Sequence, residues 1–424
     1  MKKTLAMVLA GGRVEELSVI TLFRPKAAVP FGGLYRVIDF PLSNLMNSGI
    51  DRIGILSQYR SDSLINHIGS GAAWDMIGSF RGISMLPPMK GTRSSDWYKG
   101  TADAVYQNME FISNYDPDYV LVLSGDHVYH MDYKKLIKFH ESVNADLTLA
   151  FVKVPKKGAE RFGQAIIDDE NQEGGRILRY AEKPSQFISP WASMTIYLFS
   201  RQALNFVMDE MMKPPETKHF GNDIFPVLLD KKRVYGYKFR GPWAYTRTID
   251  EYWQTNMDIL KDKPTFDIEN WNVRTNLENE HILDRTPSLF GPNSLVQQSL
   301  IHHGCRIDGI VKHSIIFPGV HIEEGAVVEN SILMFNAIVK KGAKLTQVLS
   351  DMKVVFGENA HVGVGELAAT NIEYPNLLNS GTTLVGKGTH IPANLEVGKN
   401  CIIYPNKRET DFPKTKMENG RTLK

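Results

Sequence analysis

A glycine pair and an acidic pair lie close together near the start of the chain, in the segment LAGGRVEEL (9–17). The apolar run before this segment predicts a buried strand. Gly11 and Gly12, directly after that strand, indicate a loop in which backbone approaches a phosphate closely. Val14 and the two glutamates that follow it would crowd and repel that phosphate. The segment therefore combines the shape of a phosphate loop with chemistry that opposes phosphate binding.

Two further polar clusters follow apolar runs in the first part of the chain. They are QY (58–59) and GDH (125–127). The carboxyl ends of parallel strands face one edge of a sheet, so these clusters and the glycine pair should converge on one crevice. Asp126 then offers a carboxylate for a metal ion, and the competing interpretation is an ordinary helix N-cap.

The elements that must position these residues follow an alternating pattern. Short apolar runs at 4–10, 52–58, 119–127 and 146–154 are separated by amphipathic stretches such as 102–115, which predicts a helix. The strands are apolar on both faces, which is typical of a mostly parallel sheet covered by helices. We therefore expect an α/β domain over residues 1–262.

The character of the sequence changes after residue 262. Residues 263–292 are polar and predict a linker. From residue 293 to 424 helix periodicity disappears, and VHIEEGAVVENSI (320–332) repeats as AIVKKGAKLTQVL (337–349) after 17 residues. An offset near three hexapeptides predicts a β-helix, with an antiparallel sandwich as the alternative. GTTLVGKGT (381–389) nearly matches a P-loop, but it lacks the strand–loop–helix context and is better explained as a solenoid turn.

The bulk composition limits the partners and the compartment. The 424 residues carry 49 basic and 47 acidic side chains, a net charge of +2, which gives no electrostatic reason to expect nucleic acid as a partner. No apolar run is long enough for a membrane span, and the N-terminal apolar run is too short for a signal peptide. The two cysteines, Cys305 and Cys401, suit a reducing compartment. We expect a cytoplasmic protein.

Long ordered motifs resemble the ADP-glucose pyrophosphorylase (glucose-1-phosphate adenylyltransferase) family of sugar-nucleotide enzymes. They are LAGGR (9–13), RPKAAVPFGGLYRVIDFPLSN (24–44), NSGIDRIGILSQY (47–59), WYKGTADAVYQN (97–108), SGDHVY (124–129), EKP (182–184), ASMTIYLF (192–199) and TIDEYWQTNMDIL (248–260). The resemblance covers nearly the whole chain. It implies a Rossmann-like, GT-A-like nucleotidyltransferase domain followed by a left-handed parallel β-helix.

The resemblance also implies roles for individual residues. The ligands would be ATP or ADP-glucose and glucose 1-phosphate, with Mg²⁺ as cofactor. Lys26 would lie near the nucleotide phosphates, and Asp126 would bind the metal. Nucleotide binding is implied for Leu9, Ala10, Gly11, Gly12, Gln58, Tyr98, Gly100, Thr101 and Ala102. Binding of the sugar phosphate is implied for Gly163, Glu182, Lys183, Ser193 and Trp243.

The phosphate loop departs from the family pattern. That pattern is close to G-G-x-G-[ST]-R-L, and here Val14, Glu15 and Glu16 occupy the positions of its third glycine, its hydroxyl residue and its arginine. The resemblance assigns the arginine to the phosphates that leave as pyrophosphate. Glu16 therefore reverses the charge where negative charge is greatest.

A second departure lies in PWAYTRTIDEYW (242–253). The family pattern Y-W-x-D-V-G-T-I places Tyr245 at its aspartate and Arg247 at its glycine. That aspartate is the second carboxylate for the metal, so Mg²⁺ should be weakly held or absent. Thr195 in place of a glycine and His219 in place of an aspartate are smaller losses.

These departures favour a catalytically impaired, regulatory-type subunit that modulates a catalytic paralogue in a heterotetramer. The alternative is an active homotetrameric enzyme with substituted chemistry. Arg24 and Arg36 are candidates for binding a sugar phosphate or similar anionic effector, and structural salt bridges are the competing explanation. An acyltransferase built on the β-helix is a third possibility, for which the available histidines are His302, His303, His313, His321, His361 and His390.

Overall fold

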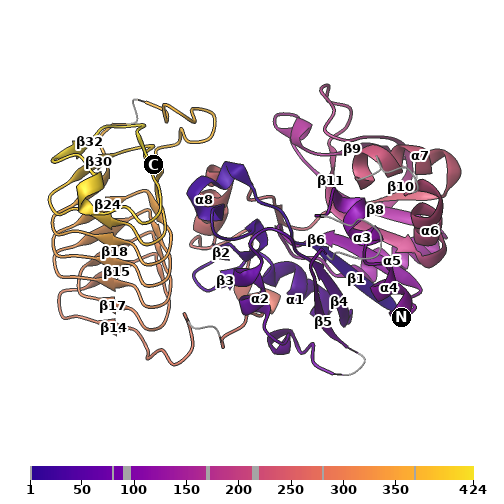
Figure 1. Cartoon of the computed structure of the whole chain (residues 1–424), viewed down its shortest axis with the longest axis horizontal. Helices are drawn as coiled ribbons and strands as arrows, with labels where there is room; N and C mark the ends of the chain where they lie inside the picture. Colours follow the sequence, from indigo (N-terminus) through magenta and orange to yellow (C-terminus); the bar gives the residue numbers. More distant parts are fainter. Residues whose placement is uncertain are drawn as a thin grey trace. The chain divides into compact units, whose positions relative to one another are not determined.

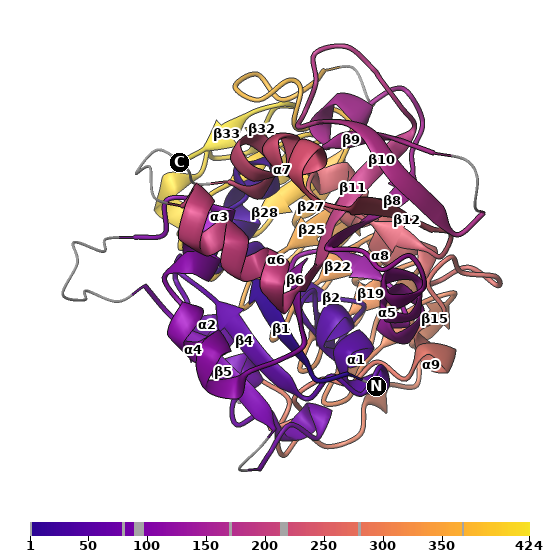
Figure 2. The ribbon, with the colours of Figure 1, turned by 90° about the vertical axis from the view of Figure 1, so that its right-hand side faces the viewer.

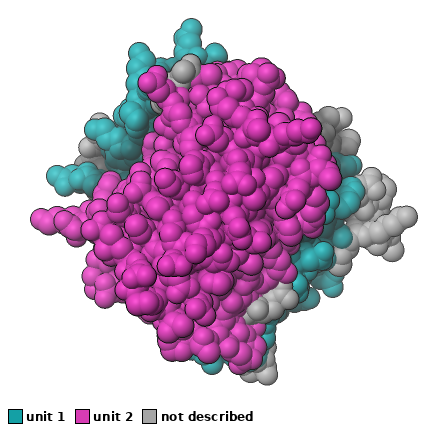
Figure 3. Space-filling model, turned by 90° about the vertical axis from the view of Figure 1, so that its left-hand side faces the viewer, with its two compact units in different colours: residues 1–12, 38–243 teal, residues 13–37, 244–424 magenta. Residues whose placement is uncertain are grey.

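The computed structural model describes residues 2–78, 81–88, 97–168, 172–212, 219–278, 281–366 and 369–424. Contacts divide the chain into two compact units. Unit 1 comprises residues 1–12 and 38–243, and unit 2 comprises residues 13–37 and 244–424. Figure 3 colours both chain segments of unit 2 in magenta. This division differs from the boundaries predicted at 262 and 292, because the segment after the glycine pair groups with the β-helix.

Unit 1 is built on a nine-stranded sheet of order β5-β4-β1-β6-β11-β8-β12-β10-β9. Its strands are β1 (Thr4–Leu9), β4 (Arg52–Leu56), β5 (Gly82–Leu86), β6 (Tyr119–Ser124), β8 (Leu147–Lys153), β9 (Gln164–Ile167), β10 (Gly174–Ala181), β11 (Trp191–Ser200) and β12 (Val234–Phe239). The four predicted strands are present. The sheet is more mixed than predicted, because β11 pairs antiparallel with both β6 and β8 and β10 pairs antiparallel with β12 and β9. The short β7 (Val128–Tyr129) follows β6, and β13 (Trp243–Ala244) lies where the chain leaves unit 1.

The helices of unit 1 pack against this sheet (Figure 2). Their bounds are α1 (Asp39–Asn47), α2 (Asp62–Ile68), α3 (Thr101–Tyr106), α4 (Met109–Tyr115), α5 (Tyr133–Ser142), α6 (Arg201–Phe206) and α7 (Phe225–Lys231). The single helix predicted over 102–115 is wrong. Asn108 leaves helical geometry, and its side chain bonds to the carbonyl of Ala104 and to the hydroxyl of Tyr98, which separates α3 from α4. None of the described helices has the length and apolar character needed to cross a membrane.

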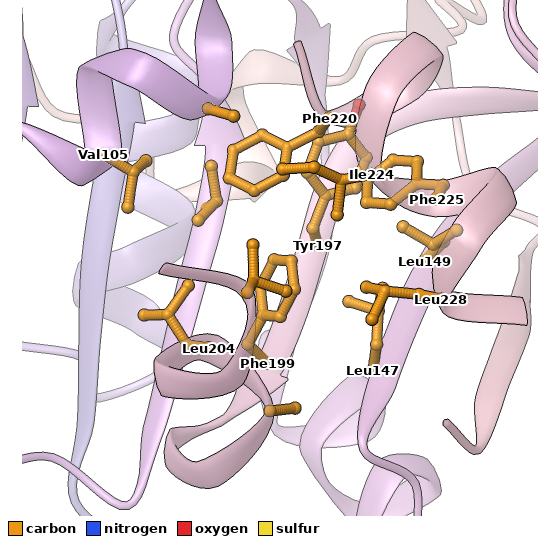
Figure 4. Close-up of a cluster of buried hydrophobic side chains, with 14 of the residues drawn as sticks. Val105, Leu147, Leu149, Tyr197, Phe199, Leu204, Phe220, Ile224, Phe225 and Leu228 are labelled. Carbon is orange, nitrogen blue, oxygen red and sulfur yellow. The ribbon is translucent and has the colours of Figure 1, made fainter. Parts of the chain in front are cut away.

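Aromatic rings fill the core of unit 1 where α6 and α7 approach β11 (Figure 4). The rings of Phe220 and Phe225 stack 5.8 Å apart, and Tyr197 meets Phe225 edge-on at 4.7 Å. All three side chains are buried. Rings of this size bury large apolar areas, so this cluster stabilises the packing of α6 and α7 against β11.

Unit 2 contains a solenoid of three parallel sheets (Figure 1). The first has β14 (Leu289–Phe290), β17 (Arg306–Ile307), β20 (His321–Ile322), β23 (Ile338–Val339), β26 (Val355–Phe356) and β29 (His390–Ile391). The second has β15 (Leu295–Gln297), β18 (Ile310–Lys312), β21 (Val327–Glu329), β24 (Lys344–Thr346), β27 (His361–Val364), β30 (Glu396–Gly398) and β32 (Lys416–Met417). The third has β16 (Leu300–Ile301), β19 (Ile315–Ile316), β22 (Ile332–Leu333), β25 (Val348–Ser350), β28 (Thr383–Val385), β31 (Ile402–Ile403) and β33 (Thr422–Leu423).

The register confirms the predicted repeat. His321 pairs with Ile338 and Val327 pairs with Lys344, so each pair is separated by one 17-residue coil. The three parallel sheets agree with the expected left-handed β-helix, which begins at Leu289 rather than at 293. The P-loop-like segment 381–389 contributes β28 and is followed by β29, not by a helix.

The segment 13–37 is joined to the rest of unit 2 by buried polar contacts. It contains two 3₁₀ turns, Glu15–Thr21 and Lys26–Ala28, and the hairpin of β2 (Pro30–Phe31) and β3 (Tyr35–Arg36); α8 (Ile249–Asp258) and α9 (Ile268–Trp271) come from the later segment. Arg24 forms a bidentate ion pair with Asp351 at 3.0 and 3.1 Å, and both side chains are buried. The backbone N–H of Gly32 donates to Asn256 of α8 at 2.8 Å. These contacts fix the segment in unit 2.

Candidate active site

The two glycines at the end of β1 differ in the space that a side chain would have at each position. A Cβ on Gly11 would lie 3.2 Å from the backbone nitrogen of Gln58, a tight contact that would require a shift of a few tenths of an ångström. A Cβ on Gly12 would meet nothing within 4 Å, and Gly12 is exposed. The carbonyl of Gly11 also accepts from the N–H of Tyr59 at 3.2 Å. The structure thus brings the ends of β1 and β4 together and leaves open space at Gly12.

A second group of predicted nucleotide residues gathers around Tyr98. Its backbone N–H donates to Oε1 of Gln58 at 2.5 Å, and its hydroxyl donates to the carbonyl of Leu86 at 2.8 Å. Burial raises the pKa of Tyr98 above that of a free tyrosine. Thr101 begins α3, with Gly100 as its N-cap and Ala102 buried behind it. Leu9 and Ala10 lead into the loop, and the N–H of Ala10 donates to the carbonyl of Leu56.

Asp126 follows β6 and is partly exposed. Its Oδ1 accepts from the hydroxyl of Ser124 and lies 3.2 Å from Nε2 of His127. The ring of His127 meets the indole of Trp243 edge-on at 5.6 Å. These neighbours hold the carboxylate while leaving part of it accessible.

The most sharply shaped part of unit 1 surrounds Glu182. Its Oε2 accepts from the hydroxyl of Tyr180 at 2.5 Å. A Cβ on Gly163 would come within 2.7 Å of the same oxygen, and a Cβ on Gly221 within 2.3 Å. The carbonyl of Gly163 accepts from the N–H of Ser193 at 2.8 Å. Two glycines therefore make room for this carboxylate, and Tyr180, which the sequence did not single out, orients it.

Lys183, a predicted sugar-phosphate residue, and Thr195, which stands in place of an expected glycine, both have left-handed backbone geometry. Lys183 has φ +44° and lies exposed directly after Glu182. Thr195 has φ +54° at an irregularity in the pairing of β11 with β8. A β-branched residue rarely adopts this geometry, which glycine adopts freely. The structure therefore explains why the resemblance expects a glycine at position 195.

Unit 2 holds a compact cluster of three residues that depart from the family pattern, Glu16, Tyr245 and Arg247, together with Lys26, which matches it. Nε of Arg247 donates to Oε1 of Glu16 at 2.7 Å, and Nη1 donates to the hydroxyl of Tyr245 at 2.9 Å. Nζ of Lys26 donates to the backbone carbonyl of Tyr245 and lies 4.6 Å from the centre of its ring. We call Glu16, Lys26, Tyr245 and Arg247 the charge-reversed cluster.

The electrostatics of this cluster follow from its ion pair. Partial burial pushes the pKa of Glu16 upward, but the hydrogen bond and charge of Arg247 outweigh it and the pKa falls below its usual range. Burial opposes the charge of Arg247, but the hydroxyl of Tyr245 and the carboxylate of Glu16 raise its pKa overall. Both partners are therefore charged at neutral pH, and each neutralises the other.

The two arginines predicted for effectors make internal contacts. Arg24 is paired with Asp351, and Nη1 of Arg36 donates to the carbonyl of Ala28 at 2.7 Å. Both are buried. An anionic ligand at Arg24 would have to displace Asp351, a partner 327 residues away that the sequence did not indicate. The effector role of this pair stays a prediction.

The residues present fit Mg²⁺ only in part. Mg²⁺ is usually bound through one or two carboxylates together with substrate phosphates. Asp126 offers one accessible carboxylate, and Tyr245 offers none where the resemblance expects the second. Among the described residues no three His, Cys, Asp or Glu side chains are grouped to hold a metal ion. The rest of the coordination would have to come from phosphates and water.

Comparison with known families agrees with both parts of the chain. Residues 5–262 match the Nucleotidyl transferase family, and residues 290–385 match the family described as GlmU-like, C-terminal hexapeptide. The first match ends at the residue where the sequence changes character. The second covers most of the solenoid.

Full-length relatives carry one common description. The chain is 41% identical over 425 residues to a protein of Thermotoga maritima, covering 99% of this chain and 98% of the relative. It is 40% identical over 406 residues to a protein of Fervidobacterium nodosum, covering 95% of each. It is 36% identical over 428 residues to a protein of Acetivibrio thermocellus, covering 100% of this chain and 98% of the relative. All three are described as glucose-1-phosphate adenylyltransferase.

Proposed function

The chain belongs to the glucose-1-phosphate adenylyltransferase family, and from that premise we propose that it is a catalytically impaired, regulatory-type subunit. In that family ATP and glucose 1-phosphate give ADP-glucose and pyrophosphate. The proposed role is to bind effectors and to modulate a catalytic paralogue in a heterotetramer.

The observation that carries this proposal is the ion pair between Glu16 and Arg247. The resemblance expects a free arginine at position 16, facing the departing phosphates. Here the same position holds an anion that is already paired with a cation of unit 2. Tyr245 adds a ring against Lys26, whose side chain is only 1% exposed. The positive charge expected for the phosphates is thereby reversed at one residue and buried at another.

Magnitudes support impaired turnover. An arginine that stabilises a phosphoryl-transfer transition state is worth about 10³–10⁵ in rate. Loss of one preorganised donor typically costs about 10²–10³. The two losses need not add, but either is large enough to leave little activity. Weak Mg²⁺ binding through Asp126 alone acts in the same direction.

The remaining features suit a ligand-binding subunit. Glu182, Gln58 and Tyr98 keep the residue types that the resemblance expects and are held by internal hydrogen bonds, which supports binding of ATP, ADP-glucose or glucose 1-phosphate. Sugar phosphates or similar anions are the proposed effectors. The two cysteines are free and buried, which suits the cytoplasm.

The same intact features favour the alternative, an active homotetrameric adenylyltransferase. The absence of a Cβ at Gly163 and Gly221 leaves room for Glu182 and for the hydroxyl of Tyr180, as a working sugar-phosphate site would need. In this alternative Arg247 takes over part of the charge stabilisation lost at position 16. The two functions differ in one measurable quantity, the turnover of the isolated chain.

The test uses the full chain with and without a paralogue that carries Arg and Asp at the positions equivalent to 16 and 245. With Mg²⁺, ATP and glucose 1-phosphate, the chain alone should stay far below about 1 s⁻¹, the lower end of ordinary enzyme turnover. The mixture should form a mixed tetramer in native mass spectrometry and show an altered effector response. Turnover of the isolated chain near 1 s⁻¹ would favour the active enzyme.

The paralogue alone is the control for the regulatory part. If the two chains form only separate homo-oligomers and the kinetics of the paralogue are unchanged, the modulating role is wrong. That outcome would leave the low turnover of the isolated chain to be explained separately.

A further inference from the structure

We propose that Arg247 is a phosphate-binding residue, which takes a phosphate group of a polyphosphate ligand without the help of Mg²⁺. The inference rests on the proposed function, because it names the ligand chemistry that a subunit without turnover would still sense. It assigns a ligand contact to a position where the resemblance expects a glycine.

The guanidinium of Arg247 is held firmly on one side and open on the other. Nε bonds to Glu16, Nη1 bonds to the hydroxyl of Tyr245, and the backbone N–H bonds to Oε2 of Glu251 at 3.0 Å. Among the described residues nothing bonds to Nη2, and the side chain is 31% exposed. The fork of donors formed by Nη1 and Nη2 matches the spacing of two phosphate oxygens.

Cations and carboxylates both lie around this fork. Lys26 and Arg247 lie near the ring of Tyr245, at 4.6 and 5.8 Å from its centre, while Glu16 pairs with the guanidinium of Arg247 and Glu251 accepts from its backbone N–H. Lys26 is covered and cannot reach a ligand directly. Arg247 is therefore the cation of this cluster that solvent and a ligand can reach.

Glu16 competes with a phosphate for the same guanidinium. Its side chain is 38% exposed, and ion pairs this exposed are weak. A multiply charged phosphate can therefore displace it or share the guanidinium with it. No carboxylate stands at position 245 to hold a metal ion, so Arg247 is the cation that this place offers to a phosphate. The guanidinium itself supplies the positive charge.

The experiment measures binding of inorganic pyrophosphate by isothermal titration calorimetry, in EDTA and at constant ionic strength. The full chain should bind, and excess Mg²⁺ should change Kd by less than about threefold. Arg247→Gln should weaken binding by about tenfold or more, as expected for loss of a charge-assisted bidentate contact. Glu16→Gln should tighten binding by about threefold, through removal of the competing carboxylate.

A double variant and a matched control make the result specific. In the Arg247→Gln background, Glu16→Gln should no longer tighten binding, because the two residues act on one contact. Arg233→Gln is the control, since Arg233 is a partly exposed arginine of unit 1 that is also paired with a carboxylate, Asp146. The Arg233→Gln variant should bind pyrophosphate with the same affinity as the unmodified chain. Unchanged melting temperatures would show that all variants are folded.

The inference is overturned if pyrophosphate binds only with Mg²⁺, if it does not bind at all, or if Arg247→Gln binds as tightly as the unmodified chain. None of these results bears on turnover. Conversely, an active isolated chain would refute the proposed function while leaving the pyrophosphate titration to decide the role of Arg247.

Discussion

Unit 1 and unit 2 differ in how far they keep the chemistry expected of an adenylyltransferase. In unit 1, Gly163 and Gly221 still shape a space for Glu182, and Gln58 still holds the backbone of Tyr98. In unit 2, Glu16 stands where the resemblance expects an arginine and Arg247 where it expects a glycine, and the two form a side-chain ion pair. Unit 1 keeps the residue types that the resemblance expects at these positions, and unit 2 departs from them at positions 16, 245 and 247.

The two altered positions are coupled by a direct contact. Glu16 and Arg247 are 231 residues apart in sequence, yet each supplies the charge that the other needs. Either substitution alone would leave an unpaired charge in a half-buried place. With both residues present, each charge has a partner of opposite sign.

The largest effect is expected where the segment 13–37 is anchored in unit 2. Asp351→Ala would leave Arg24 buried without its counter-charge and should lower the free energy of unfolding by about 3–5 kcal/mol. Denaturant unfolding of the full chain measures this. The double variant Arg24→Met with Asp351→Leu should recover most of the loss. A loss below about 1 kcal/mol for Asp351→Ala would show that the pair does not anchor the segment.

That anchor also marks the limit of the sequence-based prediction. The runs 4–10, 52–58, 119–127 and 146–154 predicted strands because local patterning determines them. The 17-residue repeat predicted the pairing of His321 with Ile338 for the same reason. The grouping of residues 13–37 with the β-helix depends on contacts such as Arg24 with Asp351, and no local pattern reports a partner 327 residues away.

The candidate site shows the same limit. Gly11, Gln58 and Tyr98 could be grouped by the resemblance, and the structure places them together. Glu16 and Arg247 were each recognised as a departure, but their pairing was not. A comparison of signs would have suggested it, since one position loses a positive charge and the other gains one.

The next effect tests whether the binding geometry of unit 1 is still in use. Gly163→Ala places a methyl group 2.1 Å from the hydroxyl of Tyr180 and 2.7 Å from Oε2 of Glu182, so both must move. Overpacking of this kind costs about 1–3 kcal/mol. Glucose 1-phosphate should then bind at least about fivefold more weakly in a calorimetric titration, the equivalent of about 1 kcal/mol. Unchanged affinity would mean that the space around Glu182, between Gly163 and Gly221, does not bind sugar phosphate.

A smaller effect concerns the strained backbone at Thr195. Its φ of +54° costs about 1–2 kcal/mol for a residue with a Cβ, and glycine loses about 0.5–1 kcal/mol of that gain through chain entropy. Thr195→Gly should therefore stabilise the chain by about 0.5–1 kcal/mol, seen as a higher melting temperature. Destabilisation would show that the side chain of Thr195 contributes packing that outweighs the strain.

The smallest effect is the stability contributed by the Glu16–Arg247 pair. The pKa of Glu16 is lowered in the folded chain, so the pair stabilises above the pKa of an unfolded glutamate and loses that stabilisation as the pH falls through the lowered pKa. Glu16→Gln should cost at most about 1 kcal/mol at pH 7, since the pair is partly exposed. The melting temperature of the unmodified chain should exceed that of Glu16→Gln by less below about pH 4 than at pH 7. A difference that grows below about pH 4 would contradict the pairing.

The most direct test of the central claim is the turnover of a variant that restores the expected residues at both altered places. Glu16→Arg with Val14→Gly returns the phosphate cation and the loop glycine, and Tyr245→Asp with Arg247→Gly returns the second carboxylate. Glu16→Arg alone should gain little, because the new guanidinium would face Arg247. The fourfold variant should raise kcat for ADP-glucose synthesis by at least about 10²-fold, or about 2.7 kcal/mol of barrier. A fourfold variant that folds and binds ATP but shows no gain would contradict the claim that the charge-reversed cluster silences this chain.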